Sequence, residues 1–165
     1  MMRQRWSLSP RGASSTESYM SADSGTGGTG SEVSELLDLR IPADLKAIGG
    51  VTDTISGILE RLEINEEKRL DIALAVQEAL ANAVVHGCKS DPSKEIRCRL
   101  RRDSGGAIVV TVTDPGPGFS PAALEDPNHP GRLYAGNGRG VYLIRQLMDE
   151  VHFEHRGNQI TMRKY

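Results

Sequence analysis

Two pairs of strand-like segments in this sequence, most of them alternating apolar and polar residues, lie on either side of a short, glycine-containing turn. The first pair occupies residues 96–100 and 107–113, with a Ser-Gly-Gly turn between them, and the second occupies residues 151–153 and 160–162 around a Gly-Asn turn. Alternation with a period of two predicts half-buried strands, and a short turn between two such strands predicts an antiparallel hairpin. The chain must therefore build a largely antiparallel sheet.

The rest of the chain predicts one more strand and three helices. A strand is expected over residues 37–41, ended by Pro42. Apolar spacing of three and four residues predicts helices over residues 45–62, 65–87 and about 140–149. The order β-α-α-β-β-loop-α-β-β, with two hairpins, predicts an α+β fold: a two-layer α/β sandwich with a mixed, mostly antiparallel sheet and the helices on one face.

The second expected helix carries a carboxylate and an amide on one row. Asn65, followed by two glutamates, is typical of a helix N-terminus. Glu78 and Asn82 are four residues apart and differ by about 40° around the axis. A carboxylate can take a proton from a nucleophile, and an amide oxygen can coordinate Mg²⁺. A solvated helix face is the alternative interpretation.

An acid and two glycines follow the strand over residues 107–113. Asp114 comes directly after the strand, and Gly116 and Gly118 lie in the loop behind it. A carboxylate at a strand end can accept a hydrogen bond from an exocyclic amine, while glycines let a ligand ring approach the backbone. A structural turn with a local aspartate contact is the alternative.

Three glycines, Gly136, Gly138 and Gly140, precede the third expected helix, and Arg139 stands between the last two. Glycines before a helix expose unpaired N–H groups at the positive end of the helix dipole, where phosphate binds well. The segment lacks the Gly-Lys-Ser/Thr of a Walker loop and does not follow a strand, so it is not a dinucleotide fingerprint either. A flexible linker is the alternative.

Composition limits the remaining classes of function. The chain has 165 residues and a formal charge of −2, which argues against direct nucleic-acid binding through bulk charge. Its apolar runs are far shorter than a membrane helix needs, and two cysteines are too few for a secreted disulfide scaffold, so a cytoplasmic protein is expected. Residues 1–32 are rich in serine and glycine and predict a disordered tail, with the folded domain over residues 33–165.

The three motifs, in this order, resemble the N, G1 and G2 boxes of the GHKL ATPase superfamily, whose members share the Bergerat ATP-binding fold. Within it, residues 78–87 and 138–151 look like the anti-sigma-factor serine kinases of bacterial stress and sporulation switches. The resemblance covers residues 36–165. It implies that Glu78 activates the hydroxyl nucleophile and that Asn82 binds Mg²⁺.

The resemblance also implies how ATP is held. It gives Asp114 the adenine, with Gly116 and Gly118 beside the base. The residues that it gives to the phosphate loop are Gly136, Gly138, Arg139 and Gly140. Thr161, on the last expected strand, matches a threonine near the adenine. His86, one turn after Asn82, is expected to face the phosphates, with a structural histidine at a helix end as the alternative.

The function that the resemblance implies is a serine/threonine protein kinase. It would transfer the γ-phosphoryl group of ATP to a serine on a STAS-type anti-anti-sigma protein and so regulate a sigma factor, with a homodimer as the assembly. The alternative is an ATP-dependent binding switch that sequesters a sigma factor or another partner without phosphorylating it. Glu78 favours the kinase, because a binding module needs no base, although ATPase relatives use the same acid to activate water.

Overall fold

The computed structural model describes residues 33–118 and 137–165. The expected disordered tail over residues 1–32 lies outside the described residues. In chain order the described elements are β1 (Ser34–Pro42), η1 (Leu45–Ala47), α1 (Ile48–Arg61), α2 (Glu66–Asn82), the π-helical segment η2 (Ala83–Gly87), β2 (Glu95–Arg102), β3 (Ile108–Thr113), α5 (Asn137–Leu147), β4 (Glu150–Glu154), η3 (His155–Gly157) and β5 (Gln159–Lys164). This order is the one that the sequence predicts.

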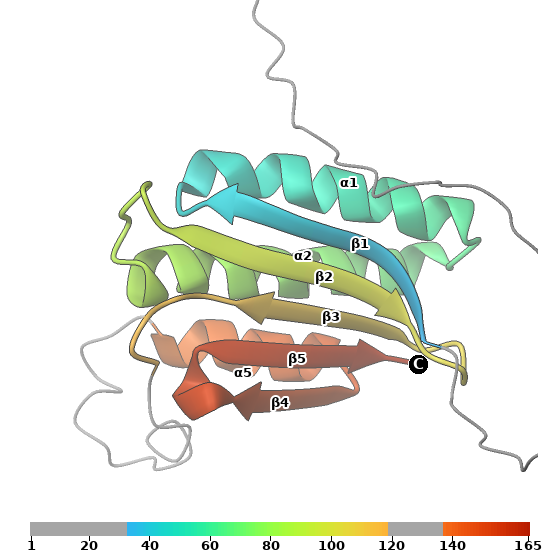
Figure 1. The fold of residues 1–165 in the computed structure, drawn as a ribbon. Coiled ribbons are helices and arrows are strands. Elements are labelled where there is room, and N and C mark those ends of the chain that lie inside the picture. The colour runs from blue at the N-terminus through green and yellow to red at the C-terminus, as the bar shows by residue number, and fades with distance from the viewer. Residues whose placement is uncertain (1–32, 119–136) are drawn as a thin grey trace, which may run out of the picture. The chain divides into compact units, whose positions relative to one another are not determined.

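The strands form a sheet in the order β1-β2-β3-β5-β4, and every neighbouring pair in it is antiparallel. The pairs β2–β3 and β4–β5 are the two expected hairpins. Because β5 also pairs with β3, with Thr113 opposite Gln159, the end of β3 lies beside the turn that leads into β5 (Figure 1). The sheet therefore brings Asp114 close to a segment more than 40 residues later in the chain.

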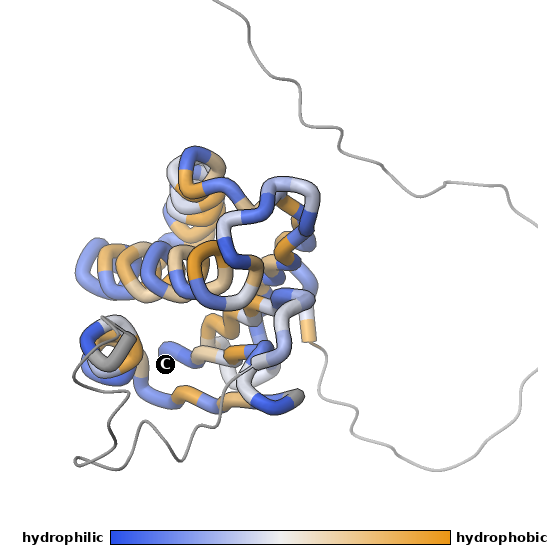
Figure 2. The backbone as a smooth tube through the Cα atoms, turned by 90° about the vertical axis from the view of Figure 1, so that its left-hand side faces the viewer, coloured by the Kyte–Doolittle hydropathy of each residue, from blue (hydrophilic) through white to orange (hydrophobic). Residues whose placement is uncertain are grey.

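The three α-helices of the described residues, α1, α2 and α5, lie on one face of the sheet, as both Figure 1 and Figure 2 show. α2 packs between α1 and α5. The core fills the space between the two layers, where inward-facing residues such as Cys98 on β2, Val110 on β3 and Met162 on β5 are fully buried. The expected two-layer α+β sandwich is confirmed.

The position of α2 follows from its first turn and its apolar residues. Asn65 caps the helix by accepting a backbone hydrogen bond from the first turn at 2.8 Å. Ile72 and Val76 are fully buried, whereas Leu70 and Leu74 are exposed to solvent. The side of α2 that carries Ile72 and Val76 therefore packs into the core, while Leu70 and Leu74 lie on a different side of the helix.

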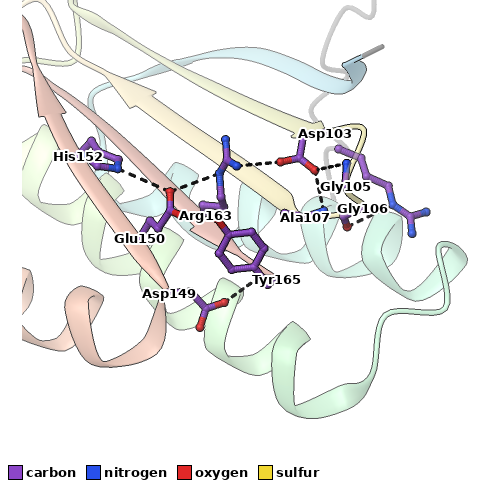
Figure 3. A network of polar contacts seen from close by, with 10 residues as sticks. Asp103, Gly105, Gly106, Ala107, Asp149, Glu150, His152, Arg163 and Tyr165 are labelled. Atoms are coloured by element: carbon purple, nitrogen blue, oxygen red, sulfur yellow. Dashed lines mark hydrogen bonds and ion pairs between the residues drawn. The ribbon is translucent and has the colours of Figure 1, made fainter. Parts of the chain in front are cut away.

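The other face of the sheet carries polar side chains joined across strands. Arg97 on β2 donates to Asp38 on β1 at 2.8 Å and holds the pKa of that carboxyl below its usual range. Arg163 on β5 pairs with Asp103 at 3.0 Å and with Glu150 on β4 at 3.6 Å (Figure 3). These pairs tie neighbouring strands together on the face away from the helices.

Candidate active site

The candidate residues on α2 meet the first turn of α5. A Cβ atom built on Gly140 would overlap the carboxylate oxygen Oε1 of Glu78 and would lie 3.1 Å from Nδ2 of Asn82. Both side chains are half-buried, so they pack against α5 and still contact solvent. Only a residue without a side chain lets the α5 backbone come this close. The structure thus brings the predicted acid–amide row and a predicted phosphate-loop glycine together.

Lys164 fixes the other end of α5. Its ammonium group donates a 2.7 Å hydrogen bond to the carbonyl of Leu147 and lies 2.8 Å from the carboxylate of Asp71 on α2. A cation at the last carbonyls of a helix stabilises its C-terminus. Because Leu147 lies near Asp71 while Gly140 lies near Glu78, α5 and α2 run in opposite directions.

The first turn of α5 contains the predicted glycine segment itself. The helix begins at Asn137, about three residues earlier than expected, so Gly138, Arg139 and Gly140 lie within it and Arg139 is exposed. The N–H groups of a first helical turn have no partners inside the helix and carry the positive end of its dipole, which suits a phosphate group. Gly136 lies outside the described residues.

The π-helical segment η2 continues α2 toward Asp114. The Cys88 N–H donates to the carbonyl of Ala83 at 2.8 Å, five residues back, which is the hydrogen bond of a π-helix. Gly87 ends this segment against Asp114, since a Cβ atom on Gly87 would overlap Oδ1 of that carboxylate and lie 2.6 Å from Oδ2. η2 therefore links the Glu78 row to the loop after β3.

Asp114 is a partly buried carboxylate with a local hydrogen bond. The Gly116 N–H donates to its Oδ1 at 2.7 Å. Burial raises the pKa of Asp114, and the Gly116 hydrogen bond opposes part of that rise. A Cβ atom on Gly116 would overlap the carbonyl oxygen of Gly87. Gly118 has a φ of +74°, and a Cβ atom on it would overlap the carbonyl oxygen of Arg156. Both loop glycines are required by the space and the backbone angle.

Asn158 holds this loop, although no motif in the sequence marks it. Its side-chain Nδ2 donates to the backbone carbonyls of Asp114 at 3.1 Å and Gly116 at 3.3 Å. The backbone carbonyl of Asn158 accepts from the Asp114 N–H at 3.0 Å. The sequence shows only a Gly-Asn turn between two strands, which any hairpin can have. Asn158 can be placed beside Asp114 only when the pairing of β5 with β3 is known.

The structure places Thr161 apart from the other candidate residues, on the opposite face of the sheet. Its Oγ1 lies 3.4 Å from Oγ1 of Thr111, its partner in the β3–β5 register. Its neighbours Ile160 and Met162 belong to the core beneath the helices. Since alternate residues of a strand point to opposite faces, Thr161 lies on the face away from α2 and α5.

His86 lies in η2 and Cys88 follows it directly, and both side chains are uncharged at neutral pH. Burial, with a smaller effect of the Lys89 charge, lowers the pKa of the half-buried His86 and favours its neutral imidazole. Burial and the nearby Asp114 charge raise the pKa of the Cys88 thiol. His86 can therefore contribute a hydrogen bond to a ligand, and Cys88 is a buried, unreactive packing residue.

The two halves of the site suit an elongated ligand. Glu78 and Gly87 are nine residues apart, which corresponds to about 13 Å of helical rise. At one end a carboxylate and glycines can receive an amine-bearing ring, and at the other a helix N-terminus can receive an anionic group beside Glu78 and Asn82. Such a ligand would bridge α2, α5 and the end of β3.

Two further observations bear on the site and its surroundings. Within residues 33–118 and 137–165, no group of three or more His, Cys, Asp or Glu side chains is placed to hold a metal ion. A magnesium ion held by one protein oxygen and by ligand phosphates requires no such cluster. In the same residues, no helix has the length and apolar character needed to cross a membrane.

Comparisons with known proteins agree with this geometry. The family described as "Histidine kinase-like ATPase domain" matches residues 41–164. The serine-protein kinase RsbW of Bacillus subtilis is 30% identical over 138 residues, which cover 79% of this chain and 86% of that protein. RsbW of Bacillus mycoides is also 30% identical, over 139 residues, with 79% and 85% covered.

A solved structure supports the fold. The crystal structure of the RsbU and RsbW domains of a Mycobacterium tuberculosis protein matches with a TM-score of 0.52 and 19% identity. The match covers 78% of this chain but only 31% of that longer chain. At this identity the likeness concerns the arrangement of sheet and helices alone.

Proposed function

Because the chain belongs to the family of histidine kinase-like ATPase domains, we propose that it is an ATP-dependent serine protein kinase of the anti-sigma-factor type. The observation that carries this proposal is the contact between Gly140 at the start of α5 and the Glu78–Asn82 row of α2. It puts a helix N-terminus, a carboxylate and an amide within reach of one phosphate group. The named relatives are serine-protein kinases, which is consistent with that chemistry.

ATP binds across the site with its adenine at Asp114. The exocyclic amine of adenine donates to the Asp114 carboxylate, and Gly116 and Gly118 leave room for the ring beside the backbone. The phosphates lie at the first turn of α5, at Gly138 and Gly140, with Arg139 as an exposed cation beside them. Gly136, directly before Asn137 in the sequence, is proposed to bind them too. His86 supplies a neutral hydrogen-bonding group in η2. The spacing of about 13 Å between the two ends supports this orientation.

Asn82 is the protein ligand for magnesium. Its amide is half-buried beside Glu78 and next to a glycine, so an ion can reach its oxygen. An amide oxygen is a hard ligand, and Mg²⁺ is commonly held by one or two protein oxygens together with substrate phosphates. When bound, the ion neutralises charge on the transferring phosphoryl group.

Glu78 orients the acceptor serine and takes its proton. The serine oxygen forms a bond to the γ-phosphorus, the bond from that phosphorus to the β,γ-bridging oxygen breaks, and ADP leaves with the electron pair of that bond. The hydroxyl proton passes to the Glu78 carboxylate. Among the acids of α2 on this row, Asp71 is nearly two turns away and is paired with Lys164, so it cannot substitute.

The acceptor is a serine on a STAS-type anti-anti-sigma protein, and the outcome is the control of a sigma factor in the cytoplasm. The chain acts as an anti-sigma factor by protein contact, without binding nucleic acid itself, and forms a homodimer. The 30% identity to RsbW kinases over most of both chains supports this assignment.

Single-turnover transfer from labelled ATP tests the function. The full chain is incubated with Mg²⁺-ATP and, in turn, with each STAS-domain protein encoded by the same genome. The kinase predicts phosphoserine on at least one of them. A chain that binds ATP and such a partner but leaves it unphosphorylated is instead a sequestering switch, and the proposed activity is then wrong.

A further inference from the structure

Two leucines on α2 are exposed although they are large and apolar. Leu70 and Leu74 are 57% and 48% exposed, one helical turn apart on the same side of the helix. Leu74 is one turn before Glu78, and the next residue, Ala75, is fully buried. The two leucines therefore form an apolar line along the solvent edge of the row that carries the proposed catalytic acid.

A third leucine extends this line onto α5. Leu143 is 40% exposed and lies three residues after Gly140, while its neighbour Ile144 is fully buried. α5 runs antiparallel to α2 from the Gly140–Glu78 contact, so the turn with Leu143 lies level with the turn with Leu74. Both leucines are displaced by one residue, about 100°, from buried neighbours. We call Leu70, Leu74 and Leu143 the leucine patch.

We propose that the leucine patch is the docking surface for the protein that carries the acceptor serine. This inference rests on the proposed kinase function. A serine hydroxyl must reach Glu78, and because α5 covers one side of that row, the acceptor must approach over the solvent edge, where the patch begins one helical turn away. An acceptor protein in that position covers the leucines with its own surface.

The chemistry of the patch also selects the kind of acceptor. Water or a small polar alcohol gains nothing from three aliphatic side chains beside the acid, whereas a folded protein can bury them. The patch thus favours an acceptor whose serine is surrounded by apolar surface. A serine in a highly charged, extended peptide would leave the leucines exposed.

The test removes the apolar character of the patch and leaves the core intact. The Leu70→Gln, Leu74→Gln double variant keeps helix propensity, because leucine and glutamine are similar helix formers. Leu45→Gln is the matched control, since Leu45 is 52% exposed on η1, which packs against α1. The probe is the STAS-domain protein that the wild-type chain phosphorylates, and the measured quantities are KM for that protein, kcat, the Kd for ATP and the melting temperature.

The double variant should raise KM for the acceptor protein by about tenfold or more, as loss of an apolar contact predicts. Its kcat, ATP affinity and melting temperature should stay at wild-type values, and Leu45→Gln should match the wild type throughout. An unchanged KM, or an equal rise in the control, overturns the docking surface while the kinase function stands. If the double variant has an unchanged KM but differs from the wild type in its mass in solution, measured by light scattering without acceptor, the leucine patch is instead a contact between two copies of this chain. If the wild-type chain phosphorylates no STAS-domain protein, both proposals fall.

Discussion

The carboxylate of Glu78 occupies the space that a side chain on Gly140 would need. Two helices that are about 60 residues apart in the chain therefore fit together only if one of them has a bare backbone at this point. The proposed acid and the proposed phosphate seat depend on each other through this contact.

Gly140→Ala tests that dependence. The added methyl group should displace Glu78 or push α5 away, lowering both the melting temperature and the affinity for ATP, the latter by roughly tenfold. Gly50→Ala in α1 is the control, because nothing lies within 4 Å of its added Cβ and alanine should stabilise the helix by up to about 1 kcal/mol. Equal stabilisation of both variants, measured by thermal unfolding, would contradict the tight contact.

Glu78→Gln should separate binding from transfer. The amide keeps the size of the side chain and loses the base, so transfer should slow by roughly 10²- to 10⁴-fold. The affinity for Mg²⁺-ATP should change little. Single-turnover phosphorylation beside calorimetric ATP titration measures both quantities, and full activity would remove Glu78 from the mechanism.

Asn82→Ala should abolish the effect of magnesium on nucleotide affinity. Alanine is a good helix former, so α2 should remain folded. The ratio of ATP affinities with magnesium and with a chelator should fall close to one in the variant and stay well above one in the wild type. An identical ratio in both proteins would locate the metal ligand elsewhere.

Asp114→Asn should weaken ATP binding and stabilise the free protein. The asparagine side chain loses the carboxylate that receives the adenine amine, which corresponds to about 1.5–3 kcal/mol for a charge-assisted hydrogen bond. The raised pKa of Asp114 means that its ionised form is disfavoured in the folded state, so the wild type loses stability as pH rises from about 3.8 through the folded pKa.

The stability difference between Asp114→Asn and the wild type should therefore be smallest in acid and largest at neutral pH. Denaturant unfolding at several pH values measures it. A difference that shrinks as the pH rises would contradict the assigned cause of the pKa shift.

Asn158→Asp should weaken ATP binding although Asn158 is assigned no contact with the nucleotide. A carboxylate cannot donate to the carbonyls of Asp114 and Gly116, so the loop loses two hydrogen bonds of about 0.5–1.5 kcal/mol each. Thr161→Val is the control on the opposite face and should leave the Kd for ATP unchanged. Equal effects of the two variants would mean that the loss comes from the sheet as a whole.

Local signals predicted most of the fold. The two hairpins, the capped start of α2 at Asn65 and the order of the elements all follow from spacing and capping along a few residues. The start of α5 was placed about three residues too late, because glycines are poor helix formers. In the structure, the contact of Gly140 with α2 outweighs that propensity.

At the site, the sequence could not predict the contacts that depend on pairing between distant segments. Glu78, Asn82 and Asp114 could be recognised from their motifs, but the contact of Asp114 with Asn158 depends on the β3–β5 register. The far face of Thr161 follows instead from its alternation with the buried Ile160 and Met162 on β5. That local pattern gives the face of Thr161, but no local pattern gives the partner of Asn158, which lies at the turn before β5.

The π-helical turn at Ala83–Gly87 makes this end of the molecule sensitive to the number of residues more than to their identity. Each residue added or removed in a helix rotates everything behind it by about 100°. Deleting one residue between Asn82 and Gly87 would remove the wide turn closed by the hydrogen bond from Cys88 to Ala83, and would change how Gly87 meets Asp114 while leaving Glu78 in place. Replacements that keep the length preserve the alignment of the two ends. Sequence drift in this segment should accordingly consist of substitutions, with insertions and deletions confined to other connections of the fold.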